Sequence, residues 1–384
     1  MIVEEVDTLV VGAGQAGIAL SEHLSNNKIP HVILEKNRIA ESWRSGRWDS
    51  LVANGPAWHD RFPNLEFSDT CPDGFPPKEE VADYLNQYAD MINAPVKTKV
   101  EVFSAERISR NAHYLIKTSI GAFKARNVVS ATGAFQYPSI PPIVPQIDTL
   151  TQLHSFHYRN PEQLPEGGVL VVGSGSSGAQ IAEELNLAGR NVYLSIGPHE
   201  RPPRAYRGRD FVWWLGVLGL WDLTAQKPGT EHVTISVSGA YNGRTMDFRR
   251  LGHNGVTLLG MATKYDNGVL TFADDLVHNI EHGDASYLKI LDDADTYIES
   301  NGLDLPEEAQ ARRKLPDPDS LINPVLELNL ARKGINTVIW ATGFKQDFNW
   351  IKVDAFDEKG APIHQRGVSK QPGIYFLGLP WQSR

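Results

Sequence analysis

The stretch VVGSGSSGAQIAEEL (171–185) decides the fold, because the same pattern has already occurred at VVGAGQAGIALSEHL (10–24). In both stretches a short apolar run leads into a Gly-x-Gly-x-x-Gly turn, and an amphipathic segment follows. A strand that enters a helix through such a turn leaves the first helical amides free to hold a phosphate group. The repeat therefore predicts an α/β protein with two Rossmann-like dinucleotide-binding domains.

The first glycine turn is followed by a strand that ends in an acid. Gly12 permits the tight turn, Gly14 lets a pyrophosphate approach the backbone, and Gly17 lets the helix pack against the strand. The next apolar run, HVILEK (31–36), ends in Glu35, where an acid accepts hydrogen bonds from ribose hydroxyls. A carboxylate there repels a 2′-phosphate, so this cradle suits FAD or NAD. We expect it to contact its cofactor through Gly12, Gly14, Gln15, Gly17, Glu35 and Lys36.

The second glycine turn is followed by a strand with a different ending. NVYLSIG (191–197) carries Ser195 where the first unit has its acid, and the loop HERPPRAYRGRD (199–210) is rich in arginine. A hydroxyl and guanidinium groups are what a 2′-phosphate needs, so NADPH is favoured here over NAD. The alternative is a solvated basic loop. The expected contacts are Gly173, Gly175, Ser176, Ser177, Gly178, Ser195, Arg201 and Arg204. One cradle would thus hold FAD and the other NADPH.

A second repeat suggests where the chain passes between the domains. SATGAF (130–135) and IWATGF (339–344) are both apolar runs that end in Ala-Thr-Gly, and the proline-dense PSIPPIVPQ (138–146) is typical of a linker. We predict a hinge and cofactor contacts at these turns, and we divide the chain into a FAD domain (1–148), an NADP domain (149–333) and a return to the FAD domain (334–384). The turn residues concerned are Ala131, Thr132, Gly133, Ala341, Thr342 and Gly343.

Composition excludes several classes of protein. The net charge of −9 argues against a nucleic-acid binder, and the single cysteine, Cys71, excludes a disulfide or a Cys-x-x-Cys redox pair within the chain. The start lacks the basic residues of a secretory signal, and the run FVWWLGVLGLWDL (211–223) is too short to span a bilayer. That run reads as a buried helix or, alternatively, as an aromatic wall over a substrate. We expect a cytoplasmic protein with no membrane insertion and no metal site; the oligomeric state stays open, a homodimer included.

Taken together, these residues resemble the NADPH-dependent flavoprotein monooxygenases, which include flavin-containing, Baeyer–Villiger and N-hydroxylating enzymes. The resemblance covers essentially the whole chain and is closest to bacterial flavoproteins that share six short motifs. They are RWDSL (47–51), DGFP (73–76), HSFHYRNP (154–161), YRGRD (206–210), FADDL (272–276) and WATGF (340–344). The resemblance implies a glutathione-reductase-like fold that binds FAD and NADPH.

The resemblance also implies a chemistry and two further site residues. Such enzymes use NADPH and O2 to form a flavin C4a-hydroperoxide, which inserts an oxygen atom into a small organic substrate. Asn54 matches the family's asparagine beside the reactive edge of the flavin, so it is the candidate catalytic residue, and Trp43 matches a tryptophan that follows the ribose-binding acid. Two alternatives remain. They are an NADPH oxidase or electron-transfer reductase with the same cofactors, and a redox sensor that only binds nucleotides.

The chain departs from the family pattern in two places. In the signature FxGxxxHxxxY, His154 and Tyr158 match, but Asp148 and Leu150 stand where phenylalanine and glycine are usual. Relatives also continue beyond the sequence GLPW (378–381), so we expect either a shortened chain or a tail outside this sequence.

Overall fold

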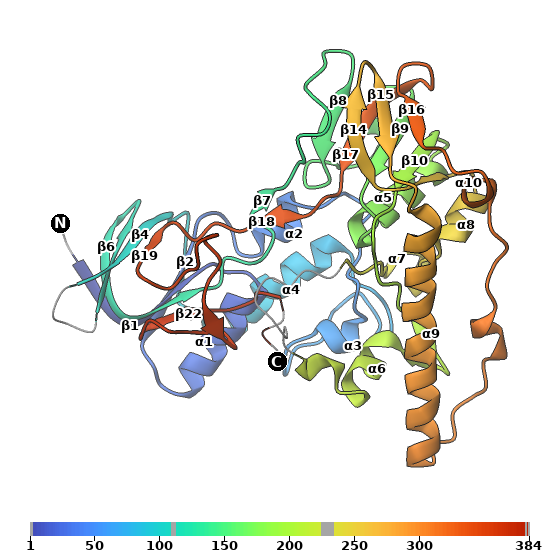
Figure 1. Ribbon diagram of the computed structural model, residues 1–384. Coiled ribbons are helices and arrows are strands. Elements are labelled where there is room, and N and C mark those ends of the chain that lie inside the picture. Colours follow the sequence, from blue (N-terminus) through green and yellow to red (C-terminus); the bar gives the residue numbers. More distant parts are fainter. Residues whose placement is uncertain (1–2, 109–112, 224–233, 381, 383–384) are drawn as a thin grey trace.

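The computed structural model describes residues 3–108, 113–223, 234–380 and 382. Two lobes lie side by side, and each is built around one large sheet (Figure 1). The first lobe contains the N-terminal part of the chain together with its last strands, and the second contains the middle of the chain. This arrangement confirms the predicted α/β fold with two Rossmann-like sheets.

The sheet of the first lobe has β1 near its centre, with β2 and β6 pairing parallel to it on either side. The C-terminal half of β1 is buried because the sheet is covered on both faces there. β4 and β5 join β6 in antiparallel pairing, and β22 brings the end of the chain back to β6 in parallel. The strands are β1 (Val3–Val11), β2 (His31–Glu35), β3 (Val96–Thr98), β4 (Val102–Arg107), β5 (Tyr114–Thr118), β6 (Gly121–Ser130), β19 (Ile351–Lys352), β20 (His364–Gln365), β21 (Val368–Ser369) and β22 (Ile374–Phe376).

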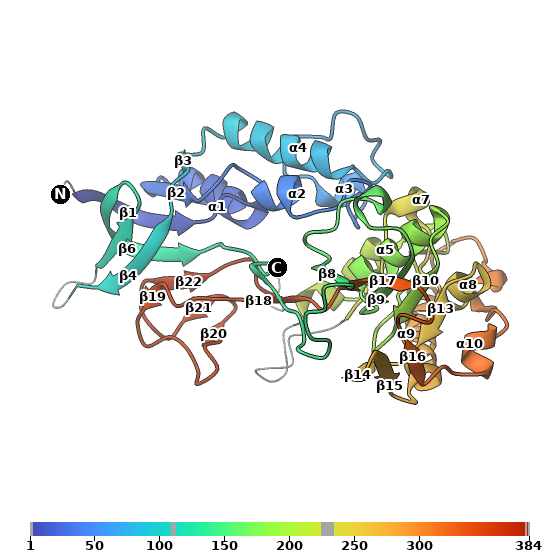
Figure 2. The same ribbon diagram turned by 90° about the horizontal axis from the view of Figure 1, so that it is seen from above.

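Helices cover one side of the first lobe. Figure 2 shows α4 along one side of it and β19 to β22 along the other. α1 begins directly after the first glycine turn, and Ile18 on it is fully buried. The helices of this lobe are α1 (Gln15–Asn26), α2 (Glu41–Ser45), α3 (Ala57–Asp60) and α4 (Lys78–Met91).

The sheet of the second lobe is parallel, in the order β13-β10-β9-β17-β8. All five residues of β9 are buried, as expected for a central strand with both faces covered. A small antiparallel sheet of β14, β15 and β16 packs beside it. The strands are β8 (Thr151–His154), β9 (Gly168–Val172), β10 (Val192–Ser195), β13 (Thr257–Leu259), β14 (Ala262–Asp266), β15 (Val269–Phe272), β16 (Glu327–Asn329) and β17 (Ile335–Trp340).

The second lobe carries the longest helix in the described residues, α9, which runs along its outer side (Figure 1). The aromatic run at 211–223 forms α6 and a short 3-10 turn, and its Trp214 is fully buried against α9. The buried-helix reading of that run is therefore the better one. The helices here are α5 (Ser176–Leu187), α6 (Phe211–Val217), α7 (Ala240–Gly243), α8 (Phe248–His253), α9 (Leu276–Asn301) and α10 (Asp319–Ile322), with 3-10 turns η1 (Pro161–Gln163), η2 (Leu220–Asp222) and η3 (Ala309–Arg312).

Two short strands connect the lobes. β7 (Tyr137–Pro138) leaves the first lobe, β18 (Phe344–Lys345) returns to it, and the two pair antiparallel. β17 belongs to the second sheet, so the return crossing follows Trp340 and lies beyond the predicted boundary at residue 334. The chain returns later than predicted because β17 pairs in parallel with the edge of β9 opposite β10. A further hairpin, β11 (Ala205–Tyr206) and β12 (Arg209–Asp210), lies in the arginine-rich loop.

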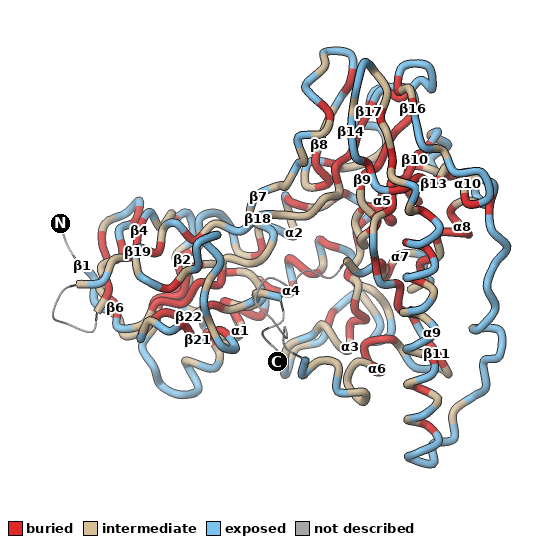
Figure 3. The backbone as a smooth tube through the Cα atoms, in the orientation of Figure 1, coloured by how far each residue is buried: buried red, intermediate tan, exposed pale blue. Residues whose placement is uncertain are grey.

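Burial follows the two sheets. Figure 3 shows buried residues along the central strands of each lobe, with exposed residues on the outer loops. Six apolar clusters make up the cores of the described chain, and the one beneath α5 also includes Trp48 and Leu51 of the first lobe. The lobes therefore share apolar contacts next to Asn54.

Candidate active site

The first glycine turn has the shape that a pyrophosphate requires. Gly12 has a φ of +110°, and a Cβ there would collide with the carbonyl oxygen of Ala131. A Cβ on Gly17 would collide with the carbonyl oxygen of Gly12. By contrast, nothing lies within 4 Å of a Cβ on Gly14, and no side chain caps the start of α1. The turn is therefore tight on the protein side and open where a phosphate would approach, which fits the pyrophosphate of FAD.

Glu35 lies at the mouth of this cradle. Its carboxylate accepts hydrogen bonds from the backbone amides of Ala13 (2.9 Å) and Asn37 (2.8 Å), which fix it at the end of β2. Lys36 instead pairs with Glu101 at 2.7 Å on the surface, and Gln15 is exposed on the first turn of α1. Their contacts with a cofactor stay predictions.

The second glycine turn has the same backbone design. Gly173 has a φ of +116°, and a Cβ there would collide with the carbonyl oxygen of Ala341. A Cβ on Gly178 would likewise collide with Gly173. The two Ala-Thr-Gly turns are thus equivalent, because each places its alanine against the first glycine of its own cradle. Ala131 and Ala341 also bond to the strands that lead into those glycines, through Val11 O (2.9 Å) and Val172 O (2.8 Å).

The polar residues of the Ala-Thr-Gly turns hold the crossing segments. Thr132 Oγ1 accepts a hydrogen bond from Gln136 Nε2 at 2.9 Å, and the carbonyl of Gly133 accepts one at 3.0 Å. In the other turn, Thr342 donates to Ser139 O, and the carbonyl of Gly343 accepts from Ser139 N at 2.9 Å. These bonds support the predicted junction between the lobes, whereas direct cofactor contacts at the turns stay predictions.

The second cradle differs from the first in what covers it. The segment 234–237 lies across it, with Thr234 Cγ2 3.4 Å from the position of a Cβ on Gly175. The amide of Ser176, at the start of α5, donates to Ile235 O at 2.9 Å, and its hydroxyl accepts from Val237 N at 3.2 Å. Ser236 Oγ donates to Ser174 O. The chain itself therefore uses one of the amides that would otherwise hold a phosphate, while the half-buried Ser177 lies beside it on the same turn.

The three residues predicted to hold a 2′-phosphate have other partners. Ser195 is buried, and its hydroxyl donates to Gly260 O (2.8 Å) and accepts from Ala262 N (3.1 Å). Arg204 is buried as well and pairs with Asp210. Arg201 pairs with Asp284 at 3.0 Å and donates to Met246 O at 3.2 Å. These side chains do not form an open anion site together, and their contact with a coenzyme stays a prediction.

Asn54 lies where the two lobes meet. Its side-chain oxygen accepts a hydrogen bond from Gln180 of α5 at 3.1 Å, and Arg204 donates to its backbone carbonyl. Gln180 also donates to Val237 O at 2.9 Å, which links Asn54 to the 234–237 segment. Asn54 is half-buried, and no described residue accepts a hydrogen bond from its Nδ2, so this donor is open to solvent or a ligand.

Glu184 forms a second link across the junction. It accepts hydrogen bonds from Ser50 of the first lobe (2.6 Å) and from the buried Tyr158 (2.8 Å). Burial and the Glu184 carboxylate raise the pKa of Tyr158, so this hydroxyl stays protonated and donates. Together with Gln180, Glu184 fixes helix α5 against residues 50–54.

His154 fastens the return crossing to the second sheet. Its Nδ1 accepts from Phe156 N (3.1 Å), so the ring proton lies on Nε2, which donates to Gly343 O (2.9 Å). Burial lowers the pKa of His154, which keeps the ring neutral. His154 and Tyr158, which match the second half of the family signature, thus bond to the second Ala-Thr-Gly turn and to helix α5.

Arg47 is a cation without a carboxylate partner in the described part of the chain. It lies half-buried, 5.8 Å from the ring of Trp43 and 4.8 Å from the ring of Phe135. Burial lowers its pKa to about 10, so it remains charged at neutral pH. Trp43 follows the first cradle and Phe135 follows the first Ala-Thr-Gly turn, which puts this guanidinium beside the predicted flavin contacts.

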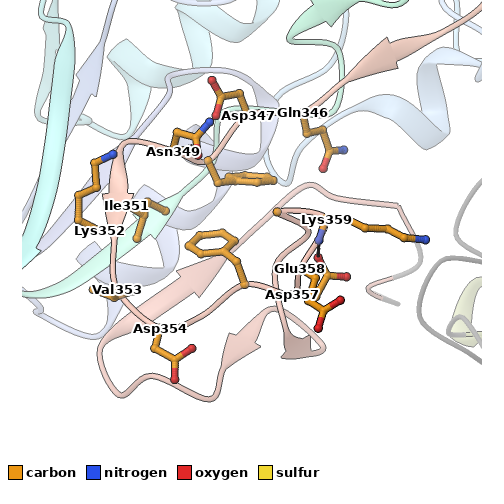
Figure 4. A pocket seen from close by; sticks show the side chains of 13 residues that line it. Gln346, Asp347, Asn349, Ile351, Lys352, Val353, Asp354, Asp357, Glu358 and Lys359 are labelled. Carbon is orange, nitrogen blue, oxygen red and sulfur yellow. Dashed lines mark hydrogen bonds between the residues drawn. The ribbon is translucent and has the colours of Figure 1, made fainter.

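A hollow of about 820 Å³ lies elsewhere, on the return segment (Figure 4). Its lining comes entirely from residues 346–360 and includes Asp347, Lys352 and Glu358. None of the predicted cofactor residues lines it. Because one mostly polar segment forms it, the hollow does not compete with the cradles as a candidate active site.

Three further observations concern the cysteine, metal ligands and membrane spans. Cys71 is exposed and free, and no described group of three or more His, Cys, Asp or Glu side chains could hold a metal ion. Among the described residues no helix is long and apolar enough to cross a membrane.

Comparisons with known proteins agree with this fold. The family model described as pyridine nucleotide-disulphide oxidoreductase matches residues 9–207, which include both glycine turns. An uncharacterized CzcO-like oxidoreductase of Geobacillus kaustophilus is 36% identical over 385 residues, covering 99% of this chain and 92% of that protein. A protein of Arabidopsis thaliana, named as a probable indole-3-pyruvate monooxygenase, is 30% identical over 192 residues, covering 46% of this chain and 43% of that protein. A solved flavin-containing monooxygenase from Stenotrophomonas maltophilia superposes with a TM-score of 0.64 at 19% identity, covering 99% of this chain and 92% of that one.

The family model and the two cradles define an oxidoreductase that uses FAD and NAD(P)H, and its fold is that of the solved flavin-containing monooxygenase. The chain belongs to the pyridine nucleotide-disulphide oxidoreductase family. It cannot use a pair of its own cysteines in the reaction, because it has only one.

The sequence did not point to all of these residues. Arg47, Gln180, Glu184 and the segment 234–237 were missed, although Arg47 lies within the motif RWDSL. Its lack of a carboxylate partner is a property of the folded chain and leaves no local signal.

Proposed function

We propose that the protein is a FAD-dependent monooxygenase that takes electrons from NADPH and oxygenates a small organic molecule. The observation that carries this proposal is that Asn54 of the first lobe accepts a hydrogen bond from Gln180 on the helix of the second cradle, in a chain with two dinucleotide cradles and a single cysteine. Without an internal dithiol, electrons from the nicotinamide coenzyme have to leave through the flavin to O2 or to an external acceptor.

The first cradle is the proposed FAD site. The amides at the start of α1 would hold the pyrophosphate at the open face of Gly14, and Glu35 would accept hydrogen bonds from ribose hydroxyls. Bound FAD would supply the hydride acceptor and the reaction with O2. The protein's own contribution is to bind, to orient and to keep water away from the reacting atoms.

The second cradle is the proposed NADPH site. The amides of Ser176 and Ser177 would hold the pyrophosphate, so the segment 234–237 would first give up its bond to Ser176. Of the three predicted 2′-phosphate residues, only Arg201 lines the pocket that contains further arginines, so it is the best placed to contact the phosphate. We therefore propose a preference for NADPH over NADH that rests on Arg201 and its neighbours.

Arg47 suggests the class of substrate. A guanidinium without a carboxylate partner, between two aromatic rings, favours an organic acid that carries an aromatic group. The guanidinium would bind the carboxylate of the acid, and the rings would pack against its aromatic group. The named substrate of the plant relative, indole-3-pyruvate, belongs to that class. Asn54 Nδ2 would donate a hydrogen bond to the reacting group at the junction.

The reaction of the reduced protein with O2 tests the proposal. The FAD-loaded protein is reduced anaerobically with NADPH and mixed with oxygenated buffer, and the flavin spectrum is followed. A monooxygenase gives a long-lived spectral species distinct from both reduced and oxidised flavin, and an aromatic acid shortens its lifetime. Immediate return to oxidised flavin, with one peroxide released per NADPH, would instead assign an oxidase or an electron-transfer reductase.

A further inference from the structure

A second, smaller pocket lies between α8, α9 and the segment 310–315. Its volume is about 210 Å³, below the roughly 300–1,000 Å³ of sites for drug-sized ligands. Tyr287 and Leu288 form its less polar side, and the carboxylates among its lining residues are Asp247 and Asp284. The cations that line it are Arg201, Arg249, Arg250, Arg312, Arg313 and Lys314.

Some of these cations are neutralised within the protein. Arg249 pairs with Asp284 (2.7 Å) and Asp317 (2.6 Å), and Arg312 reaches out of the pocket to two aspartates of α9. Arg201 shares Asp284, whose closest contact with Lys314 is 3.8 Å. The carboxylates near the pocket are therefore already shared among several cations.

Arg250 and Arg313 have no ion pair in the described part of the chain. The half-buried Arg250 donates from one Nη to Thr245 O at 2.7 Å, while its Nε is shielded from solvent and has no acceptor. Burial, and then the neighbouring Arg244, lower the pKa of Arg250. An unpaired guanidinium that is partly shielded from water is costly unless an anion compensates it. Arg313 is exposed at the rim of the same pocket.

We propose that this pocket binds a small phosphate ester, held by Arg250 and Arg313 with Arg201 and Lys314 near it. A doubly charged oxyanion matches two unpaired guanidinium groups, which bind phosphate in a bidentate manner. The small volume suits a phosphate group with a short carbon skeleton, or the phosphate end of a larger molecule that extends out of the pocket.

The phosphate could come from two sources. Arg201 belongs to the loop after β10, so the 2′-phosphate of NADPH is one source, and this one rests on the proposed function. A separate phosphorylated metabolite is the other, and it does not depend on the reaction. The site itself can be tested without any turnover.

The test is a calorimetric titration of inorganic phosphate into the FAD-loaded protein, with sodium chloride at the same ionic strength as the reference. The wild-type protein should bind one phosphate. Arg250→Gln and Arg313→Gln should each weaken binding at least tenfold, or about 1.4 kcal/mol. Arg332→Gln, which removes an exposed arginine of the β16–β17 connection, should bind like the wild type. Because Arg313 is exposed, its variant should fold normally even if the Arg250 variant does not.

The source of the phosphate follows from whether 2′,5′-ADP or 5′-AMP displaces inorganic phosphate from the pocket. Displacement by 2′,5′-ADP alone assigns the pocket to the coenzyme, and displacement by neither assigns it to a separate phosphate ester. The proposal is overturned if the wild-type protein does not bind phosphate, or if both arginine variants bind it as tightly as the wild type. Neither result depends on whether the protein is a monooxygenase.

Discussion

Ser236 offers the most direct way to examine the segment that lies across the second cradle. This residue is fully buried, and its hydroxyl donates to Ser174 O within the glycine turn. If NADPH has to displace the segment 234–237, the protein without coenzyme is mostly in a closed form. The measured affinity is then reduced by the fraction of molecules that are closed.

The Ser236→Ala variant removes one hydrogen bond from the closed form only. Such a bond contributes about 1 kcal/mol net, and the loss also leaves the carbonyl of Ser174 without its donor. The apparent Kd for NADPH should therefore fall about fivefold. The control is Ser238→Ala, because Ser238 is also buried but its hydroxyl accepts from Ala240 N, outside the cradle. That variant should stay within about twofold of the wild type.

The assay is anaerobic stopped-flow reduction of the bound flavin over a range of NADPH concentrations, which gives Kd and the rate of reduction separately. A lower Kd in Ser236→Ala with an unchanged limiting rate supports displacement. An unchanged or higher Kd, or an equal effect in Ser238→Ala, would mean that the segment stays in place and forms part of the finished site.

Four further predictions concern the first cradle, acid stability and the junction. Gly12→Ala should lose about 1–3 kcal/mol of stability because of its positive φ and the collision with Ala131. Gly14→Ala should instead keep the wild-type Tm and bind FAD at least tenfold more weakly. Thermal unfolding measures the first effect and flavin fluorescence measures the second. Burial lowers the pKa of His199 to about 4, so the free energy of unfolding should fall by about 3 kcal/mol between pH 6.5 and pH 4 and should not change through this group above pH 6.5. In urea unfolding, His199→Asn should reduce this pH dependence, whereas the control His278→Asn should leave it unchanged. Tyr158→Phe should lower the free energy of unfolding in urea by about 1.5–3 kcal/mol, because the Tyr158 hydroxyl donates to the charged Glu184. The control Ser50→Ala removes an exposed hydrogen bond to the same carboxylate and should lower it by less than about 1 kcal/mol. Asn54→Ala should keep its FAD but release more peroxide per NADPH consumed; if Gln180→Ala gives the same increase, Asn54 acts only by docking the lobes.

The backbone of both cradles could be predicted from the sequence, and the reason is steric. Gly12 and Gly173 adopt a positive φ and lie against a carbonyl oxygen, so any side chain there is strained, and the two glycines can be recognised in the sequence. The Ala-Thr-Gly repeats could be found in the same way, although their place against the first glycine of each cradle was unexpected. The glycine spacing is a local motif, whereas the alanine contacts join Gly12 to Ala131 and Gly173 to Ala341, which are far apart in the sequence.

The arginine-rich loop shows why the 2′-phosphate prediction is less secure. Its pattern indicated free guanidinium groups, but Arg201 pairs with Asp284, which lies 83 residues away in the sequence. Arg204 pairs with Asp210 and donates to the backbone of Asn54, 150 residues away. An ion pair between distant residues leaves no local signal, so a basic loop in a sequence does not reveal which of its cations remain free.

The cover of the second cradle had no local signal either. The segment 234–237 contains only small polar and aliphatic residues, and it reaches the glycine turn through hydrogen bonds to Ser174 and Ser176. The boundary at residue 334 was also set too early, because β17 pairs with β9 and β8 before the chain returns. The pairing of β17 sets the position of that boundary, and the motif IWATGF alone does not show this pairing.

In the proposed function, a flavin in the first cradle is reduced by a nicotinamide coenzyme in the second. An anaerobic titration of the purified, FAD-loaded protein with NADPH and, separately, with NADH measures this directly. One equivalent of NADPH should bleach the bound flavin, and NADH should do so only at higher concentration. A flavin that stays oxidised with both coenzymes would mean that the protein binds nucleotides without passing electrons between them.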